Sequence, residues 1–269
     1  MENPKMNDGD FWTLLKGKGY RFSPASLSAG AGEGKGVLPI TQGTTILSLK
    51  YQDGVLVAGD RRATAGTTVM HDRTDKVIDI DRHSVLAIAG VPATAFEIAR
   101  VMEHTFKYYR RSQLQELSLE GKMRALSKLL KENIPMAMQG IGAVAPIYAA
   151  YDNQRGEGKI FFYDMLGAGF EGVEYSVSGS GSPAIRGVLH YQNRWGLGPL
   201  AQMSEEKAIV LTMRLLETAA EFDSATGGVN RESRLYPTIK LVTSGGVRNI
   251  PGDQLESLYT GQVTVNPSK

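Results

Sequence analysis

A threonine at the start of a chain carries a nucleophilic hydroxyl and a free amine on neighbouring atoms. That amine has an ordinary pKa of about 7.7–8.0, so it can accept the hydroxyl proton near neutral pH. Thr44 comes directly after Gly43 and opens a β-rich run that ends at Tyr51. A cut between Gly43 and Thr44 would create this arrangement, and glycine places no Cβ in the way of an attacking hydroxyl. The pattern indicates either a threonine nucleophile or, more simply, an ordinary β-branched strand start.

Two charged residues lie where predicted strands end or begin. Asp60 comes after an apolar run that ends at Gly59, and Lys76 precedes Val77. Taken singly, Asp60 is typical of a polar turn and Lys76 of a solvated surface. If they are buried side by side, they would form an ion pair, because burying either charge alone has a large free-energy cost. A buried cation near Thr44 would lower the pKa of its hydroxyl and keep the α-amine neutral, so that the amine could act as a base.

The composition argues against several other chemistries. The chain has 269 residues, of which 42% are hydrophobic and 22% charged, as in ordinary globular proteins. The absence of cysteine excludes disulfides, a cysteine nucleophile and thiolate metal sites. The four histidines are scattered, without a metal-binding pair. We therefore expect no metal and no cofactor.

Charge and hydropathy also bear on partners and location. The net charge is +2 and there is no dense Lys/Arg tract, so nothing indicates nucleic-acid binding. No apolar run reaches the roughly 18–20 residues of a membrane span. The first residues lack the basic-then-apolar pattern of a signal peptide. We expect a cytoplasmic protein with no membrane contact.

Residues 1–43 differ in composition from the rest of the chain. Residues 23–36 are rich in serine and glycine, which is the composition of a flexible linker. The segment is either a disordered tail or a pro-segment that ends at Gly43. On the second interpretation, autocleavage removes residues 1–43 and residues 44–269 form a single domain.

The order of elements predicts the fold class. Strand patterns occupy 44–51, 55–58, 77–80, 85–89, 147–151, 159–163, 173–177, 238–243 and 247–250. Helical patterns lie between the fourth and fifth of these strands, and again after Pro183 and Ser204. Groups of strands and groups of helices thus follow one another, and single strands do not alternate with single helices as they do in βαβ units. We predict an α+β protein, a four-layer αββα sandwich of two mostly antiparallel sheets with helices on both outer faces.

Six separated motifs follow one another over about residues 43–250. They are Thr44-Thr45-Ile46 after a glycine, Gly59-Asp60-Arg61-Arg62-Ala63-Thr64, Lys76, Ala89-Gly90, Gly179-Ser180-Gly181-Ser182 and Asp223-x-x-Thr226-Gly227-Gly228. In this order they resemble the motifs of proteasome β-subunits. Met138-Gln139-Gly140 and Asp223–Gly228 resemble the actinobacterial type in particular.

This resemblance implies a threonine endopeptidase with the N-terminal-nucleophile hydrolase fold. Thr44 would be the nucleophile and its amine the base, with Asp60 and Lys76 as the charged pair beside it. The Gly90 amide would be the oxyanion donor, a type of contact worth roughly 3–4 kcal/mol in acyl transfer. Three further residues would hold and orient the new N-terminus: Ser180, Asp223 and Thr226, the last of which is serine in many relatives.

The resemblance also implies a substrate site and partners. The substrate-binding residues would be Ala63, Thr64, Thr74, Ile78, Ile88 and Phe96. None is charged, which favours an apolar residue before the cleaved bond. Pro92 has no N–H, so one backbone contact that the family makes with substrate would be missing. The partners would be α-subunits and other β-subunits in stacked heptameric rings, an ATP-dependent unfoldase ring and unfolded polypeptides.

Three alternatives belong to other classes or subfamilies. A simpler two-ring, ATPase-dependent bacterial protease has shorter subunits and a different motif after Gly-Asp. A catalytically silent ring subunit would have a structural role only, but the intact Thr44, Asp60 and Lys76 argue against it. A phosphate-binding loop at residues 179–182 would lack the Gly-Lys-Ser/Thr of a P-loop.

Overall fold

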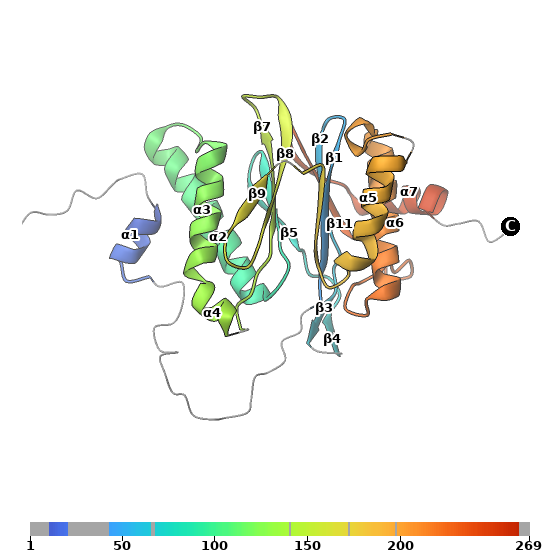
Figure 1. Ribbon diagram of the computed structural model, residues 1–269, viewed down its shortest axis with the longest axis horizontal. Coiled ribbons are helices and arrows are strands. Elements are labelled where there is room, and N and C mark those ends of the chain that lie inside the picture. The colour runs from blue at the N-terminus through green and yellow to red at the C-terminus, as the bar shows by residue number, and fades with distance from the viewer. Residues whose placement is uncertain are drawn as a thin grey trace, which may run out of the picture.

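Two five-stranded antiparallel sheets pack face to face in the computed structural model (Figure 1). The structure describes residues 11–20, 43–65, 68–139, 141–171, 173–196 and 198–263. The first sheet has the order β10 (Tyr175–Gly179), β1 (Thr45–Tyr51), β2 (Gly54–Gly59), β11 (Thr238–Thr243), β12 (Gly246–Asn249). The second has the order β5 (Val77–Asp81), β6 (Ser84–Ala87), β7 (Ile147–Asp152), β8 (Glu157–Tyr163), β9 (Gly169–Glu171).

Strand β2 shows why its sequence is apolar throughout. Alternate side chains of a strand point to opposite faces of the sheet. Val55 and Val57 enter the core between the two sheets. Leu56 and Ala58 enter the core between the first sheet and its helices. Both sets are fully buried, so the strand is covered on both faces.

Helices cover both outer faces of the sandwich. On the second sheet lie α2 (Pro92–Gln113) and α3 (Leu119–Glu132), with the short α4 (Ile134–Met138) after them. On the first sheet lie α5 (Ser182–Trp195) and α6 (Glu205–Phe222). The chain is completed by η1 (Leu200–Gln202), α7 (Gly252–Leu258) and η2 (Tyr259–Val263). The α+β class and the four-layer αββα arrangement are thus confirmed.

Some elements differ from the sequence-based expectation. A small hairpin of β3 (Ala63–Ala65) and β4 (Thr68–His71) comes after the first two strands, where no strand was expected. A helix, α1 (Phe11–Gly17), forms within the segment before Thr44. The expected linker at residues 23–36 lies outside the described residues. Within the part of the chain that the structure describes, no helix has the length and apolar character needed to cross a membrane.

Candidate active site

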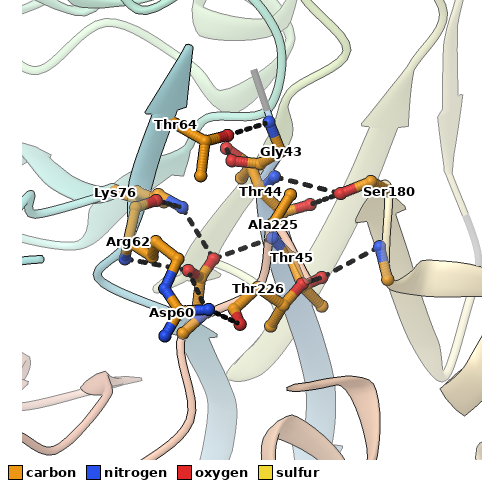
Figure 2. A network of polar contacts seen from close by, with 12 residues as sticks. Gly43, Thr44, Thr45, Asp60, Arg62, Thr64, Lys76, Ser180, Ala225 and Thr226 are labelled. Atoms are coloured by element: carbon orange, nitrogen blue, oxygen red, sulfur yellow. Dashed lines mark hydrogen bonds and ion pairs between the residues drawn. The ribbon is translucent and has the colours of Figure 1, made fainter. Parts of the chain in front are cut away.

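The ends of three strands bring the conspicuous residues of the sequence together. Thr44 immediately precedes β1 and Asp60 comes immediately after β2, and the antiparallel register pairs Ile46 with Gly59. Lys76 immediately precedes β5 in the other sheet. The cluster therefore lies at one end of the sandwich, where both sheets contribute to it (Figure 2).

Asp60 and Lys76 form a buried ion pair. The Lys76 Nζ donates to Asp60 Oδ1 at 2.7 Å, and the side chains of Lys76 and Asp60 are 5% and 0% exposed, respectively. Asp60 Oδ1 also accepts the Thr45 N–H at 2.8 Å, and Asp60 Oδ2 accepts the N–H groups of Arg62 and Gly227, each at 2.9 Å. A buried carboxylate with this many donors is well compensated. The ion pair between Asp60 and Lys76, which was one of two interpretations of the sequence, is therefore present in the structure.

The protonation of Lys76 is set by opposing effects. Burial lowers its pKa, and the negative charge of Asp60 with its hydrogen bond opposes this without cancelling it. The Nζ group also donates to the Arg62 carbonyl oxygen at 2.6 Å. A lysine whose pKa lies below its ordinary value releases a proton more readily than a surface lysine does. Lys76 is therefore held against Asp60 with its pKa below the ordinary value for lysine.

A chain of hydroxyl groups links Thr44 to the other side of the cluster. The Thr44 N–H donates to Ser180 Oγ at 3.2 Å, and Ser180 Oγ donates to Asp223 Oδ2 at 2.6 Å. The Thr226 hydroxyl donates to the same carboxylate oxygen at 2.6 Å and lies 2.6 Å from the Thr45 hydroxyl. The sequence-predicted residues Ser180, Asp223 and Thr226 thus form one hydrogen-bonded group, in which Ser180 contacts the Thr44 N–H and Thr226 contacts the Thr45 hydroxyl.

The charge of Asp223 is stabilised by these donors. Burial alone would raise its pKa, but hydrogen bonds from Ser180, Thr226 and the Ala225 N–H outweigh burial and leave the pKa below its ordinary value. Asp223 therefore remains an acceptor at neutral pH, and this fixes the direction of the hydroxyl hydrogen bonds.

The junction between Gly43 and Thr44 is tightly enclosed. Thr44 is 5% exposed, and its hydroxyl donates to the Gly43 carbonyl oxygen at 2.8 Å. The Gly43 N–H donates to the Thr64 hydroxyl at 3.2 Å. A Cβ on Gly43 would lie 1.7 Å from the Cβ of Ala225, far inside contact distance. Only glycine fits between Ala225 and Thr44 in this backbone conformation.

Two further glycines are required by the backbone. Gly90 has a φ of 114°, and a Cβ there would lie 2.1 Å from the Ala143 carbonyl oxygen. Gly179 has a φ of 95°, and a Cβ there would lie 1.9 Å from the Thr44 carbonyl oxygen. Positive φ at this range favours glycine. Gly179 therefore allows the backbone of the turn after β10 to lie in close contact with the Thr44 backbone.

The predicted substrate-binding residues occupy several different settings. Ala63 and Thr64 lie on β3, and Thr64 contacts the Gly43–Thr44 junction through Gly43. Thr74 is half-buried before β5, and its N–H donates to the Arg61 carbonyl oxygen at 2.9 Å. The other three belong to or border the second sheet and α2: Ile78 is half-buried on β5, Ile88 is 4% exposed in the helix–sheet core, and Phe96 is 36% exposed on α2.

Sequence reasoning missed three contributors. Arg62 acts through its backbone, and its guanidinium donates to the carbonyl oxygens of Ser224 and Thr226 at 2.9 and 3.2 Å. Thr45 contributes its hydroxyl and its N–H. Ala225 contributes its N–H, which donates to Asp223 Oδ1 at 3.1 Å, and the methyl group that faces Gly43. Arg62 and Thr45 lie within two of the six motifs, but no role was assigned to them there. A backbone carbonyl group such as that of Arg62, or a methyl group such as that of Ala225, leaves no side-chain pattern in a sequence.

Comparisons with known proteins agree with this geometry. A family model described as Proteasome subunit matches residues 40–231. Proteasome subunit beta 2 of Thermomonospora curvata is 38% identical over 219 residues, covering 81% of this chain and 76% of that protein. Proteasome subunit beta of Acidimicrobium ferrooxidans is 35% identical over 257 residues, covering 95% and 90%. Proteasome subunit beta of Jonesia denitrificans is 36% identical over 208 residues, covering 77% and 67%.

Proposed function

Because the chain belongs to the proteasome subunit family and its relatives are β-subunits, we propose that it is a threonine endopeptidase that activates itself at Gly43–Thr44. The observation that carries this proposal is the enclosed junction. The Thr44 hydroxyl lies against the carbonyl group that it would attack, and its N–H is held by Ser180. Asp60, which accepts the Thr45 N–H, is paired with the buried Lys76.

Self-cleavage would proceed by acyl transfer. Thr44 Oγ attacks the Gly43 carbonyl carbon and loses its proton to a nearby base, while the C–N bond breaks and the nitrogen takes up a proton as the α-amine. The Gly43 acyl group is then an ester on Thr44 Oγ. Water hydrolyses this ester, which releases residues 1–43 as a carboxylate and leaves Thr44 as the N-terminus. Residues 1–43 are thus proposed to be a pro-segment, and residues 44–269 the mature domain.

Turnover of a substrate would repeat this chemistry with the free amine as base. Thr44 Oγ attacks the substrate carbonyl carbon, the amine takes the hydroxyl proton, and that proton passes to the departing amine of the peptide. Water then hydrolyses the acyl-enzyme ester. The Lys76 cation, which Asp60 holds in place, favours the deprotonated hydroxyl electrostatically. The Ser180–Asp223–Thr226 group orients the amine, and the Gly90 N–H is proposed to bind the developing oxyanion.

Family membership supports further parts of the proposal. Proteasome subunits assemble into core rings, so we propose that this chain joins other β-subunits and α-subunits in such a particle. Unfolded polypeptides would be its substrates, delivered by an ATP-dependent unfoldase, and the absence of cysteine fits a cytoplasmic location.

The test is a single substitution at the nucleophile. Thr44→Ala should leave the full-length chain of 269 residues, because no hydroxyl is present to attack Gly43, whereas Thr68→Ala on the exposed strand β4 should be processed as in the wild type. Mass spectrometry of the purified proteins gives the result. Chains beginning at residue 44 in the Thr44→Ala protein, in the absence of active subunits, would refute the intramolecular mechanism.

A further inference from the structure

The segment before Thr44 carries its own docking element. Helix α1 packs on the outer face of α2 and α3 (Figure 1), and residues 21–42 separate it from the junction. A helix of seven residues is not stable by itself in water. Packing against α2 and α3 must therefore hold α1 in place.

Aromatic side chains anchor this helix. Trp12 is 4% exposed and belongs to the same core cluster as α2, α3 and the second sheet. The Phe11 ring lies 5.4 Å from the Tyr108 ring on α2. Tyr20 packs edge-on against Trp12, with 5.8 Å between the ring centroids. A buried tryptophan surrounded by other rings is typical of a residue that dominates binding.

Polar contacts fix the orientation of α1. Glu132, the last residue of α3, accepts the Trp12 indole N–H at 2.8 Å and the Lys16 ammonium group at 2.7 Å. The Lys16 Nζ also lies 5.3 Å from the centre of the Trp12 ring. The Tyr20 hydroxyl donates to Glu97 on α2, and burial with this carboxylate raises the Tyr20 pKa to about 12. None of these contacts involves the bond between residues 43 and 44.

We propose that the outer face of α2 and α3 is a peptide-binding site whose ligand is residues 11–20 of the same chain, and that it retains this segment noncovalently after the Gly43–Thr44 bond is cut. The cut itself rests on the proposed function, but the docking site does not. Cleavage and release of the pro-segment are then two separate steps. Until release, α1 keeps an apolar surface of α2 and α3 covered.

The two tryptophans of the chain provide a direct probe. Trp195 is 63% exposed, so a Trp195→Phe background leaves buried Trp12 as the only indole. We expect blue-shifted Trp12 emission, shielded from acrylamide, in the uncut Thr44→Ala chain. A site-specific protease sequence inserted within residues 23–36 then makes the cut independent of Thr44. Trp12 should stay shielded after this cut, and native mass spectrometry should find the fragment still bound.

Substitutions within α1 test the assigned contacts. Trp12→Ala, in the chain that keeps Trp195, should increase the dissociation of the cut fragment at least about thirtyfold, as for a binding hot spot. Lys16→Ala should weaken retention, whereas the exposed Lys18→Ala should leave it unchanged. Separation of the cut N-terminal fragment from the rest of the chain is monitored by dilution and gel filtration.

The outcomes separate this inference from the proposed function. Free quenching of Trp12 in the uncut Thr44→Ala chain would show that α1 is not docked. Loss of the fragment as soon as the protease cuts would overturn retention. Failure of the wild-type chain to cut itself would refute the proposed function and leave the docking result intact.

Discussion

At the scale of single residues, the buried ion pair gives the sharpest prediction. Lys76→Ala should lower hydrolysis of short peptides, and self-cleavage, by at least about a hundredfold, the usual scale for acid–base groups. The physical reason is the loss of the cation that favours a deprotonated Thr44 hydroxyl. The measurement is the rate of fluorogenic peptide cleavage in correctly assembled protein.

The chain contains a matched control for the destabilisation that this change brings. Lys122 on α3 pairs with Asp81 at 2.6 Å, and both side chains are largely buried. Breaking a buried pair costs about 3–5 kcal/mol wherever it lies, so Lys122→Ala should also lower the melting temperature. Only Lys76→Ala should lower the rate in the folded protein. Equal rates of peptide hydrolysis in the two variants would show that Lys76 has a structural role only.

The contact between Gly43 and Ala225 predicts a rescue. Gly43→Ala should slow self-cleavage about a hundredfold, because small misplacements of reacting atoms have effects of this size. Adding Ala225→Gly removes the methyl group that lies 1.7 Å from the new Cβ and should restore part of the rate. Recovery stays partial, because the Ala225 Cα would still lie 2.8 Å away. Normal processing of the Gly43→Ala chain, measured from gel bands over time, would contradict the steric argument.

The candidate site could be predicted from sequence as far as its side chains carry recognisable chemistry. Asp60 and Lys76 were expected to pair if buried together, and they do; their catalytic role stays a prediction. The Arg62 carbonyl that accepts from Lys76 and the methyl group of Ala225 were not foreseen. Contacts of this kind depend on the path of the backbone, which side-chain types do not report.

At the scale of elements, the turn between β10 and α5 contacts the backbone of Thr44, the proposed nucleophile. Gly179→Ala should place a methyl group against the Thr44 carbonyl oxygen, displace the junction and block self-cleavage. Gly187→Ala, in α5 itself, meets nothing within 4 Å and should instead add about 0.5–1 kcal/mol to stability through helix propensity. Thermal melts and processing assays compare the two variants. Processing of Gly179→Ala at the wild-type rate would remove this turn from the mechanism.

Elements were predictable where hydrophobic patterns are long and local. The expected strand over residues 238–243 coincides with β11. The helical patterns expected between the fourth and fifth strands correspond to α2 and α3, and α3 is capped by Ser118, whose hydroxyl accepts the Gly121 N–H. The β3–β4 hairpin was missed because β4 is exposed along its whole length, so no apolar alternation marks it. Helix α1 was missed because seven residues give too short a pattern, and tertiary contacts stabilise it.

At the scale of the whole molecule, we expect enclosure and assembly to determine which substrates are cut. A subunit with residues 1–43 attached should be inactive, because Thr44 lacks a free amine while Gly43 is bonded to it. A protease whose sites lie inside a closed ring admits extended chains only. The assembled particle should therefore cleave short peptides and leave folded proteins intact unless an unfolding partner is present.

The preference of that particle depends on the residues proposed to line its substrate site. Ala63, Thr74, Ile78, Ile88 and Phe96 carry no charge, and burying an unpaired charge is costly. Peptides should thus be cut faster after Leu, Tyr or Phe than after Arg or Glu. The chain is purified alone and with a cognate α-subunit, sized by gel filtration, and assayed with a fluorogenic panel. Preference for Arg or Glu would show that other side chains form the pocket, and full activity in a monomer that retains residues 1–43 would defeat the N-terminal-threonine mechanism itself.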